Sequence, residues 1–186
     1  MMFQKEKSQF LGKKDKSVKG NIDKDILKIV ELINNKNNYY TTSSCSGRII
    51  VYEKKRKKQD TNFLYVTHEK AGFNIKDIKN IKGNDIWLRQ EGFILHVCCK
   101  TIKDAEKLLN LVMKAGLKRS GIISLKKKKK NMIEIIGTET MDTIIMDNGK
   151  FLASDEYLNI LIREANKKML RNSEKIIKLY DILKGL

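Results

Sequence analysis

The sequence predicts an α+β fold, in which a mixed sheet is flanked by helices and the chain ends in one long helix. Strand-like and helix-like segments alternate irregularly along the chain, and residues 154–184 carry a single helical pattern. The Gly-x-Gly-x-x-Gly fingerprint of Rossmann folds is absent, as is a phosphate-binding Gly-Lys-Ser/Thr loop. The length of 186 residues suits a single domain, residues 1–186.

The first half of the chain is expected to contain an N-terminal arm, two helices and three strands. Residues 1–20 are polar, as expected of an irregular or helical arm. Residues 22–36 form an amphipathic helix, because apolar residues recur at helical spacing: Ile22, Ile26, Ile29, Val30 and Ile33. Extended patterns cover 39–42, 48–53 and 62–68, and residues 74–81 suit a short helix.

The second half adds five strands and two helices. Strands are predicted at 85–90 and 93–99, on either side of Glu91 and Gly92, and again at 121–125, 131–136 and 141–146. Thr101 and Asp104 form a capping box for a helix that runs to Ala115. Gly116 stands where such a helix ends.

The last helix is predicted over residues 154–184. Ser154 is its expected N-cap, and acidic side chains follow in the first turn. Its apolar seam has alternating four- and three-residue spacing: Leu158, Ile162, Ala165, Met169, Asn172, Ile176, Leu179 and Leu183. Such a seam suits packing on the chain's own sheet and also pairing with a second copy, so the sequence is compatible with a monomer or a homodimer.

The chain is strongly basic, which favours a polyanionic partner. Lys and Arg number 39 and Asp and Glu 22, giving a net charge of 39 − 22 = +17. Lysine-rich runs at 54–58 and 126–130 supply ten of these charges, and such runs are equally typical of solvated loops. There is no apolar run long enough to span a membrane and no secretory signal pattern, so we expect a cytoplasmic protein without a membrane partner.

A polar segment, 41–48, is the most informative for chemistry. Its sequence is TTSSCSGR, six small hydroxyl or thiol side chains followed by a glycine and an arginine. Hydroxyls and backbone N–H groups beside a glycine can hold carboxylate or phosphate oxygens, and arginine adds a bidentate fork. The same composition is also typical of a polar turn that makes its own local hydrogen bonds.

Two histidines and one further basic turn complete the candidates. His68 ends a predicted strand, which suits a residue facing a cleft. His96 lies within an apolar strand, where a histidine is more often a core residue than a catalytic base. His96 and Cys98 share a strand face, but the spacing matches no zinc motif and we expect no metal. A glycine turn at 118–121 (Lys118, Arg119, Ser120 and Gly121) suits a phosphate contact or a solvated loop, and Trp87 suits base stacking or core packing.

Taken together, these segments resemble the family of tRNA wybutosine-synthesizing protein 3. The matching strings run in order along nearly the whole chain: SQF (8–10), DKSVKGNID (15–23), YYTTSSCSGRI (39–49), YVTHE (65–69), FILHV (93–97), GLKRSGIISL (116–125), EIIGTE (134–139) and DEYLNILIREANKKM (155–169). TTSSCSGRI, ILHV and RSGI are together the most specific of these strings.

The resemblance implies a methyltransferase with a non-Rossmann fold. It implies transfer from S-adenosyl-L-methionine to the N-4 position of the tricyclic wybutosine precursor at position 37, in the anticodon region of phenylalanine tRNA. The residues it implies for donor binding are Ser43, Ser44, Cys45, Ser46, Gly47, Ser120 and Gly121. Those implied for catalysis are Arg48, His68 and His96, and those for RNA binding are Lys118 and Arg119.

Methyl transfer from a sulfonium chiefly requires that nitrogen, methyl carbon and sulfur be held in line. We therefore expect the serine, arginine and histidine side chains to converge on one pocket, with a histidine taking the ring proton. Two alternatives remain open at this point. One is a non-catalytic RNA-binding module, and the other is a metal-dependent hydrolase.

Overall fold

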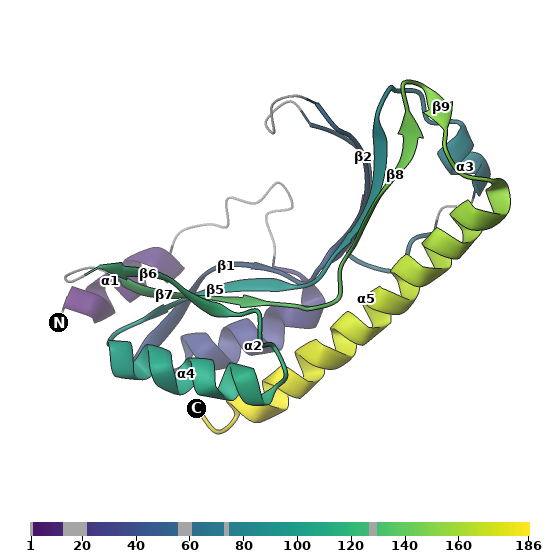
Figure 1. Ribbon diagram of the computed structural model, residues 1–186. Coiled ribbons are helices and arrows are strands. Elements are labelled where there is room, and N and C mark those ends of the chain that lie inside the picture. Colours follow the sequence, from purple (N-terminus) through teal and green to yellow (C-terminus); the bar gives the residue numbers. More distant parts are fainter. Residues whose placement is uncertain (1, 13–21, 56–60, 73–74, 127–129) are drawn as a thin grey trace. The chain divides into compact units, whose positions relative to one another are not determined.

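The computed structural model confirms the α+β class and describes residues 2–12, 22–55, 61–72, 75–126 and 130–186. Within these residues the elements, in chain order, are α1 (Met2–Leu11), α2 (Lys24–Asn34), β1 (Tyr39–Cys45), β2 (Arg48–Glu53), β3 (Asn62–Thr67), α3 (Ile75–Lys79), β4 (Ile86–Glu91), β5 (Ile94–Cys99), α4 (Ile102–Lys114), β6 (Gly121–Lys126), β7 (Lys130–Ile136), β8 (Met141–Asp147), β9 (Lys150–Phe151) and α5 (Asp155–Leu183) (Figure 1). Most of both expected lysine runs, 56–58 and 127–129, lies outside the described residues.

The chain divides into two compact units, each built from separate stretches of sequence. The first unit comprises Met1–Ser46, Phe93–Thr138 and Ser173–Leu186, and the second comprises Gly47–Gly92 and Glu139–Asn172. Each unit carries one antiparallel sheet, with strand order β1-β5-β7-β6 in the first and β3-β2-β4-β8-β9 in the second. Strands that are neighbours in sequence, β1 with β2 and β4 with β5, therefore belong to different sheets.

The core of the first unit lies on one face of its sheet, which α2 and α4 cover (Figure 1). Strand side chains of this face alternate with outward-facing ones, so that Leu95 and Val97 are buried against the helices while His96 points to the other face. The C-terminal turns of α5 contribute Ile176, Leu179 and Leu183 to the same cluster. On the other face α1 packs near Tyr40, whose ring lies 5.4 Å from that of Phe3 and 5.6 Å from that of Phe10.

Two sequence-based expectations for this unit are confirmed in detail. The capping box of α4 is present: the Thr101 hydroxyl accepts from the Asp104 N–H, and the Asp104 carboxylate accepts from the Thr101 N–H. Gly116 adopts φ +88°, the left-handed conformation that ends helices. Helix α2 is shorter than expected, because Ile22 lies before its first turn and stays exposed.

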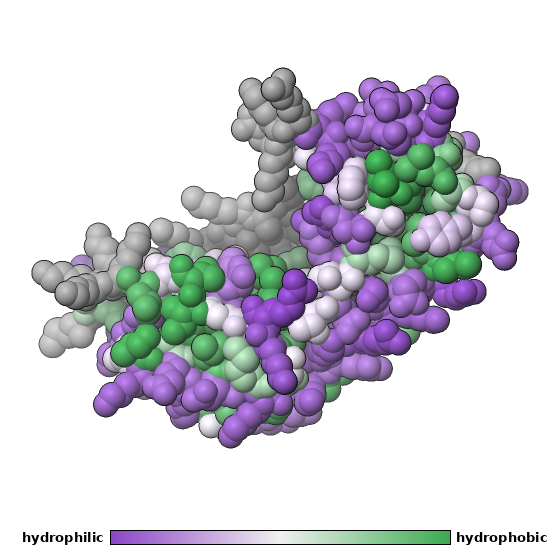
Figure 2. Space-filling model, in the orientation of Figure 1, coloured by the Kyte–Doolittle hydropathy of each residue, from purple (hydrophilic) through white to green (hydrophobic). Residues whose placement is uncertain are grey.

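The core of the second unit lies between its sheet and the first part of α5. Ile49, Val51 and Leu88 from the sheet pack with Leu158, Ile162, Ala165 and Met169 of the helix. The apolar seam of α5 is thus buried within the chain, as Asn172 is, so the seam is not a surface for pairing with a second copy. The outward side of α5 is mostly hydrophilic (Figure 2).

The β8–β9 hairpin is an element that the sequence reading did not predict. Asn148 and Gly149 have φ of 48° and 77°, as a tight hairpin turn with two left-handed residues requires. Among the described residues, no helix has the length and apolar character needed to cross a membrane.

Candidate functional site

A row of polar side chains crosses the sheet of the first unit on the face opposite its core. Strand pairing sets Ser43 opposite His96, His96 opposite Glu134, and Glu134 opposite Gly121, so one residue from each of the four strands lies in the row. The Ser43 Oγ lies 2.6 Å from His96 Nδ1, and His96 Nε2 lies 2.9 Å from Glu134 Oε1. The side chains of His96 and Glu134 are 26% and 30% exposed, so the row is open to solvent.

The hydrogen bonds of the row define the tautomer of the neutral imidazole. An ionised carboxylate only accepts, so His96 Nε2 donates its hydrogen to Glu134. In the neutral ring Nδ1 then carries the lone pair and accepts from the Ser43 hydroxyl. The arrangement can therefore pass a proton from the Ser43 oxygen to His96 while Glu134 stabilises the charged ring.

A β-bulge brings Ser43 into the row. The pairing register of β1 with β5 shifts between Thr41 and Ser43, and the extra residue reorients the rest of β1. The sequence predicts extended structure over 39–42 and a joining segment over 43–47, which is wrong for residues 43–45. These residues continue β1, and only Ser46 and Gly47 connect β1 to β2.

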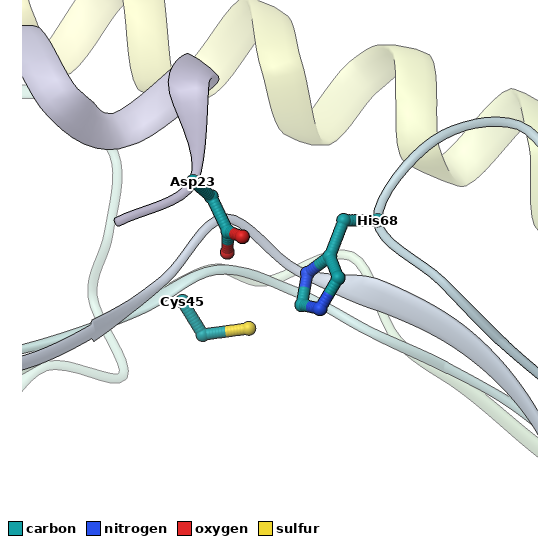
Figure 3. Close-up of side chains that lie close together, drawn as sticks. All are labelled: Asp23, Cys45 and His68. Carbon is teal, nitrogen blue, oxygen red and sulfur yellow. The ribbon is translucent and has the colours of Figure 1, made fainter. Parts of the chain in front are cut away.

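Buried polar bonds fix the connection after β1. The Asp23 carboxylate accepts from the Ser46 N–H at 2.9 Å and from the Ser46 hydroxyl at 3.1 Å, and Ser46 is 3% exposed. The Asp23 side chain points toward the strand that carries Cys45, and one of its oxygens lies within 4.8 Å of Cys45 Sγ (Figure 3). Asp23 is not among the candidates that the sequence predicts, because an acidic residue in the first turn of a helix has an ordinary local role.

The glycine turn at 118–121 ends next to the row, at Gly121. Gly121 is the first residue of β6, and a Cβ added to it would meet nothing within 4 Å, so there is open space beside Glu134. The Ser120 hydroxyl is buried and accepts from the Ile136 N–H at 3.1 Å, which ties the segment to β7. Lys118 and Arg119 precede it with exposed side chains.

Arg48 and His68 belong to the second unit. Arg48 opens β2 opposite Glu91 of β4, and its Nε donates to Glu91 Oε2 at 2.7 Å. His68 directly follows β3, and its Nδ1 lies 3.0 Å from the carbonyl oxygen of Gly47. Because a carbonyl only accepts, the hydrogen of the neutral ring is on Nδ1 and the lone pair is on Nε2.

Glu134 and Glu91 are the partners that sequence reasoning did not find. Each lies opposite a predicted catalytic residue on the neighbouring strand, and the pairing register that joins them is a property of the folded sheet. The sequence carries one signal for Glu134, which is the alternation of residues in 131–136. The side chains on either side of it, Ile133 and Ile135, face the core, so Glu134 faces the other way.

A family model and individual relatives all match this chain over most of its length. The protein-family model described as "Methyltransferase TYW3" matches residues 5–185. The "tRNA wybutosine-synthesizing protein 3 homolog" of Bos taurus is 35% identical over 191 residues, which cover 97% of this chain and 72% of that protein. A Pyrococcus horikoshii protein, "tRNA(Phe) 7-((3-amino-3-carboxypropyl)-4-demethylwyosine(37)-N(4))-methyltransferase 1", is 36% identical over 172 residues, 90% of this chain and 87% of that protein.

Solved structures agree with this result. One from Pyrococcus horikoshii superposes with a TM-score of 0.86 at 36% identity and covers 97% of this chain and 95% of its own. A hypothetical protein from Aeropyrum pernix gives a TM-score of 0.73 at 26% identity, over 88% of this chain and 96% of its own.

Proposed function

Because the chain belongs to the TYW3 methyltransferase family, we propose that it methylates the N-4 ring nitrogen of the tricyclic wybutosine precursor at position 37 of phenylalanine tRNA. The names of the archaeal and vertebrate relatives support this substrate. The single observation that carries the chemistry is the hydrogen-bonded row of Ser43, His96 and Glu134.

The donor that we propose is S-adenosyl-L-methionine, which supplies an activated methyl group and leaves as its thioether. Its polar groups are a carboxylate, an ammonium, two ribose hydroxyls and an adenine. The first unit offers partners for these groups on the face of the row: the Ser43 hydroxyl, the open space at Gly121, and the exposed cations of Lys118 and Arg119. Ser44 pairs with the core residue Leu95, so its hydroxyl lies on the opposite face of the sheet from Ser43. Ser46 and Ser120, whose hydroxyls are buried, support donor binding by fixing the backbone of Cys45, Gly47 and Gly121.

The row handles the proton that the substrate nitrogen loses. As the nitrogen–carbon bond forms and the carbon–sulfur bond breaks, the electron pair of that bond stays on sulfur. The N–H proton of the substrate passes to Ser43 Oγ while the Ser43 hydroxyl proton passes to His96 Nδ1. Glu134, hydrogen-bonded to Nε2, holds the ring and stabilises its positive charge.

The second unit carries Arg48 and His68, and each is held by a partner within that unit. Glu91 holds the Arg48 guanidinium through Nε, which leaves the two terminal nitrogens of the fork to a phosphate or carboxylate oxygen. The Gly47 carbonyl accepts from His68 Nδ1 and orients the ring, which leaves Nε2 as an acceptor for a hydrogen bond from RNA. The base enters out of its stack, as enzymes acting on nucleobases require.

The test is methylation of precursor-bearing phenylalanine tRNA with labelled donor and mass analysis of the nucleoside. His96→Gln is expected to lower kcat by about 10²- to 10⁴-fold, the usual contribution of a general base. Glu134→Gln is expected to cost about 10- to 100-fold, since it removes one hydrogen bond to a charged group, and Glu134→Asp restores part of the rate. The matched control is Glu106→Gln, an exposed glutamate on α4.

Two results would contradict the proposal. One is the wild-type protein leaving the precursor unmethylated while binding the tRNA, which would favour a non-catalytic RNA-binding module. The other is wild-type kcat in His96→Gln and Glu134→Gln together, which would remove the row from the reaction. A raised KM with unchanged kcat would likewise contradict a role in proton transfer.

A further inference from the structure

Three aromatic rings lie in register on the face of the second unit's sheet that is opposite its core. Tyr52 of β2 pairs with Phe63 of β3 on one side and with Trp87 of β4 on the other. The core side chains Val51 and Leu88 alternate with them and point to the opposite face. The Phe63 side chain is 51% exposed, although a phenylalanine on a sheet gains most from burial.

Each ring of this face has a cationic side chain beside it. The Arg48 guanidinium carbon lies 5.7 Å from the Phe63 centroid, the Lys54 Nζ lies 4.7 Å from the Trp87 centroid, and the Arg89 guanidinium carbon lies 4.9 Å from the Tyr52 centroid. These are cation–π distances. Tyr52 is buried beneath its neighbours, so Phe63 and Trp87 are the rings that a ligand can reach.

Charge indicates what kind of ligand suits the face. Lys54 and Lys55 are exposed at the end of β2, where the sequence continues the basic run KKRKK over 54–58. Interleaved rings and cations are the composition of sites that stack bases and hold the intervening phosphates. A long cationic side chain can move from the ring to a phosphate, which exposes the ring to a base.

The spacing of the rings selects unpaired nucleotides. Phe63 and Trp87 are separated by two strand spacings, which is about 9–10 Å. Stacked bases in a duplex strand are only about 3.4 Å apart. Two bases can therefore stack on the two rings only if they are splayed, as in a single-stranded loop.

We propose that this face, defined by Phe63, Trp87 and Lys54, binds unpaired nucleotides of the RNA substrate by stacking. The proposal rests on the proposed function for the identity of the RNA, but its physical claim is that the face binds single-stranded RNA. It adds a docking surface to the turn of Lys118 and Arg119, which lies in the other unit.

The only tryptophan of the chain is a built-in probe, because Trp87 lies on the proposed face. We expect a single-stranded oligouridine to quench Trp87 fluorescence on titration, and a duplex RNA of equal length to leave it unchanged at equal occupancy. Phe63→Ala is expected to weaken oligouridine binding by about 5- to 100-fold, the range for loss of one stacking contact. Lys54→Glu is expected to weaken it as well and to make binding less dependent on salt.

The matched control is Tyr157→Ala, which removes an aromatic side chain that is also 51% exposed, on α5 of the same unit. Unchanged fluorescence on RNA binding, together with wild-type affinity in Phe63→Ala and Lys54→Glu, would overturn the proposal. Equal weakening in Phe63→Ala and Tyr157→Ala would also overturn it. These measurements use RNA without donor, so they test the binding face even if the protein does not methylate the tRNA. If Phe63→Ala methylates the tRNA with an unchanged KM, the binding face is refuted and the proposed methylation is not.

Discussion

Asp23 stands at the N-cap of α2, yet its carboxylate accepts two hydrogen bonds from Ser46 and none from the helix that it precedes. An aspartate in this position ordinarily bonds the N–H groups of its own first turn. Here the side chain makes no capping hydrogen bond and instead holds the connection after β1. Asp23 is 8% exposed. The Asp23 carboxylate therefore stabilises the connection between β1 and β2 rather than the start of its own helix.

Asp23→Ala is therefore expected to destabilise the protein although it removes no helix cap. The substitution leaves the buried Ser46 N–H and hydroxyl without this acceptor, which costs about 1–3 kcal/mol in the free energy of unfolding. Urea denaturation measures this loss, and hydrogen exchange at the Ser46 amide should accelerate. Asp25→Ala, two residues along in the first turn of α2 and exposed, is the control, and equal losses in both variants would contradict the assignment.

Gly47→Ala should perturb the same connection from the other side. Gly47 is buried with φ +95°, a conformation that costs a residue with a Cβ about 1–2 kcal/mol. Its carbonyl also orients His68, so methylation should fall as well as stability. The exposed Gly72, where an added Cβ meets nothing within 4 Å, is the control, and Gly72→Ala should leave both quantities unchanged. Wild-type stability and activity in Gly47→Ala would refute the requirement for glycine.

Asn166 holds the backbone of the segment that follows His68. Its Oδ1 accepts from the Ala71 N–H at 2.7 Å, and its Nδ2 donates to the Ala71 carbonyl at 3.4 Å. Asn166→Ala is expected to raise hydrogen exchange at Ala71 by about tenfold and to lower the free energy of unfolding by about 1 kcal/mol. Asn159→Ala, exposed on the same helix, should do neither. Protection at Ala71 that survives in Asn166→Ala would mean that another contact holds the segment.

Stability should decline in alkali because the first unit buries ionisable groups in their neutral forms. Burial raises the pKa of the Cys99 thiol to about 12, and it raises the pKa of the Tyr39 and Tyr40 hydroxyls well above their ordinary value. The unfolded chain ionises first, so the folded state binds more protons above pH 9 and stability falls as pH rises. Each such group adds a slope of up to about 1.4 kcal/mol per pH unit.

Urea denaturation at pH 8, 9, 10 and 10.5 measures this slope. Cys99→Ala removes the contribution of the thiol and should flatten the curve between pH 9 and 10, whereas Cys45→Ala, at a half-exposed site, should leave that interval unchanged. A free energy of unfolding that stays constant from pH 8 to 10.5 would show that these groups ionise equally well in the folded state.

The sequence by itself determined the elements and the residue types of the site. The pattern of apolar residues predicts α2, α4, α5 and most strands, and the capping box and Gly116 mark the limits of α4, because these features depend on neighbours in the chain. The family strings pointed to Ser43, His96 and Gly121 before their neighbours in space were known. The Asn148-Gly149 pair is an equally local signal, typical of a two-residue hairpin turn.

Only the tertiary structure decided which side chains meet. His96 is as compatible with a core position as with an open face until the register of β5 against β7 sets Glu134 beside it. The bulge in β1 that turns Ser43 toward His96 leaves no mark in the sequence, and neither does the bond between Asp23 and Ser46. Register, bulges and long-range hydrogen bonds depend on how distant strands pack, and the free energy that selects them is summed over the whole fold.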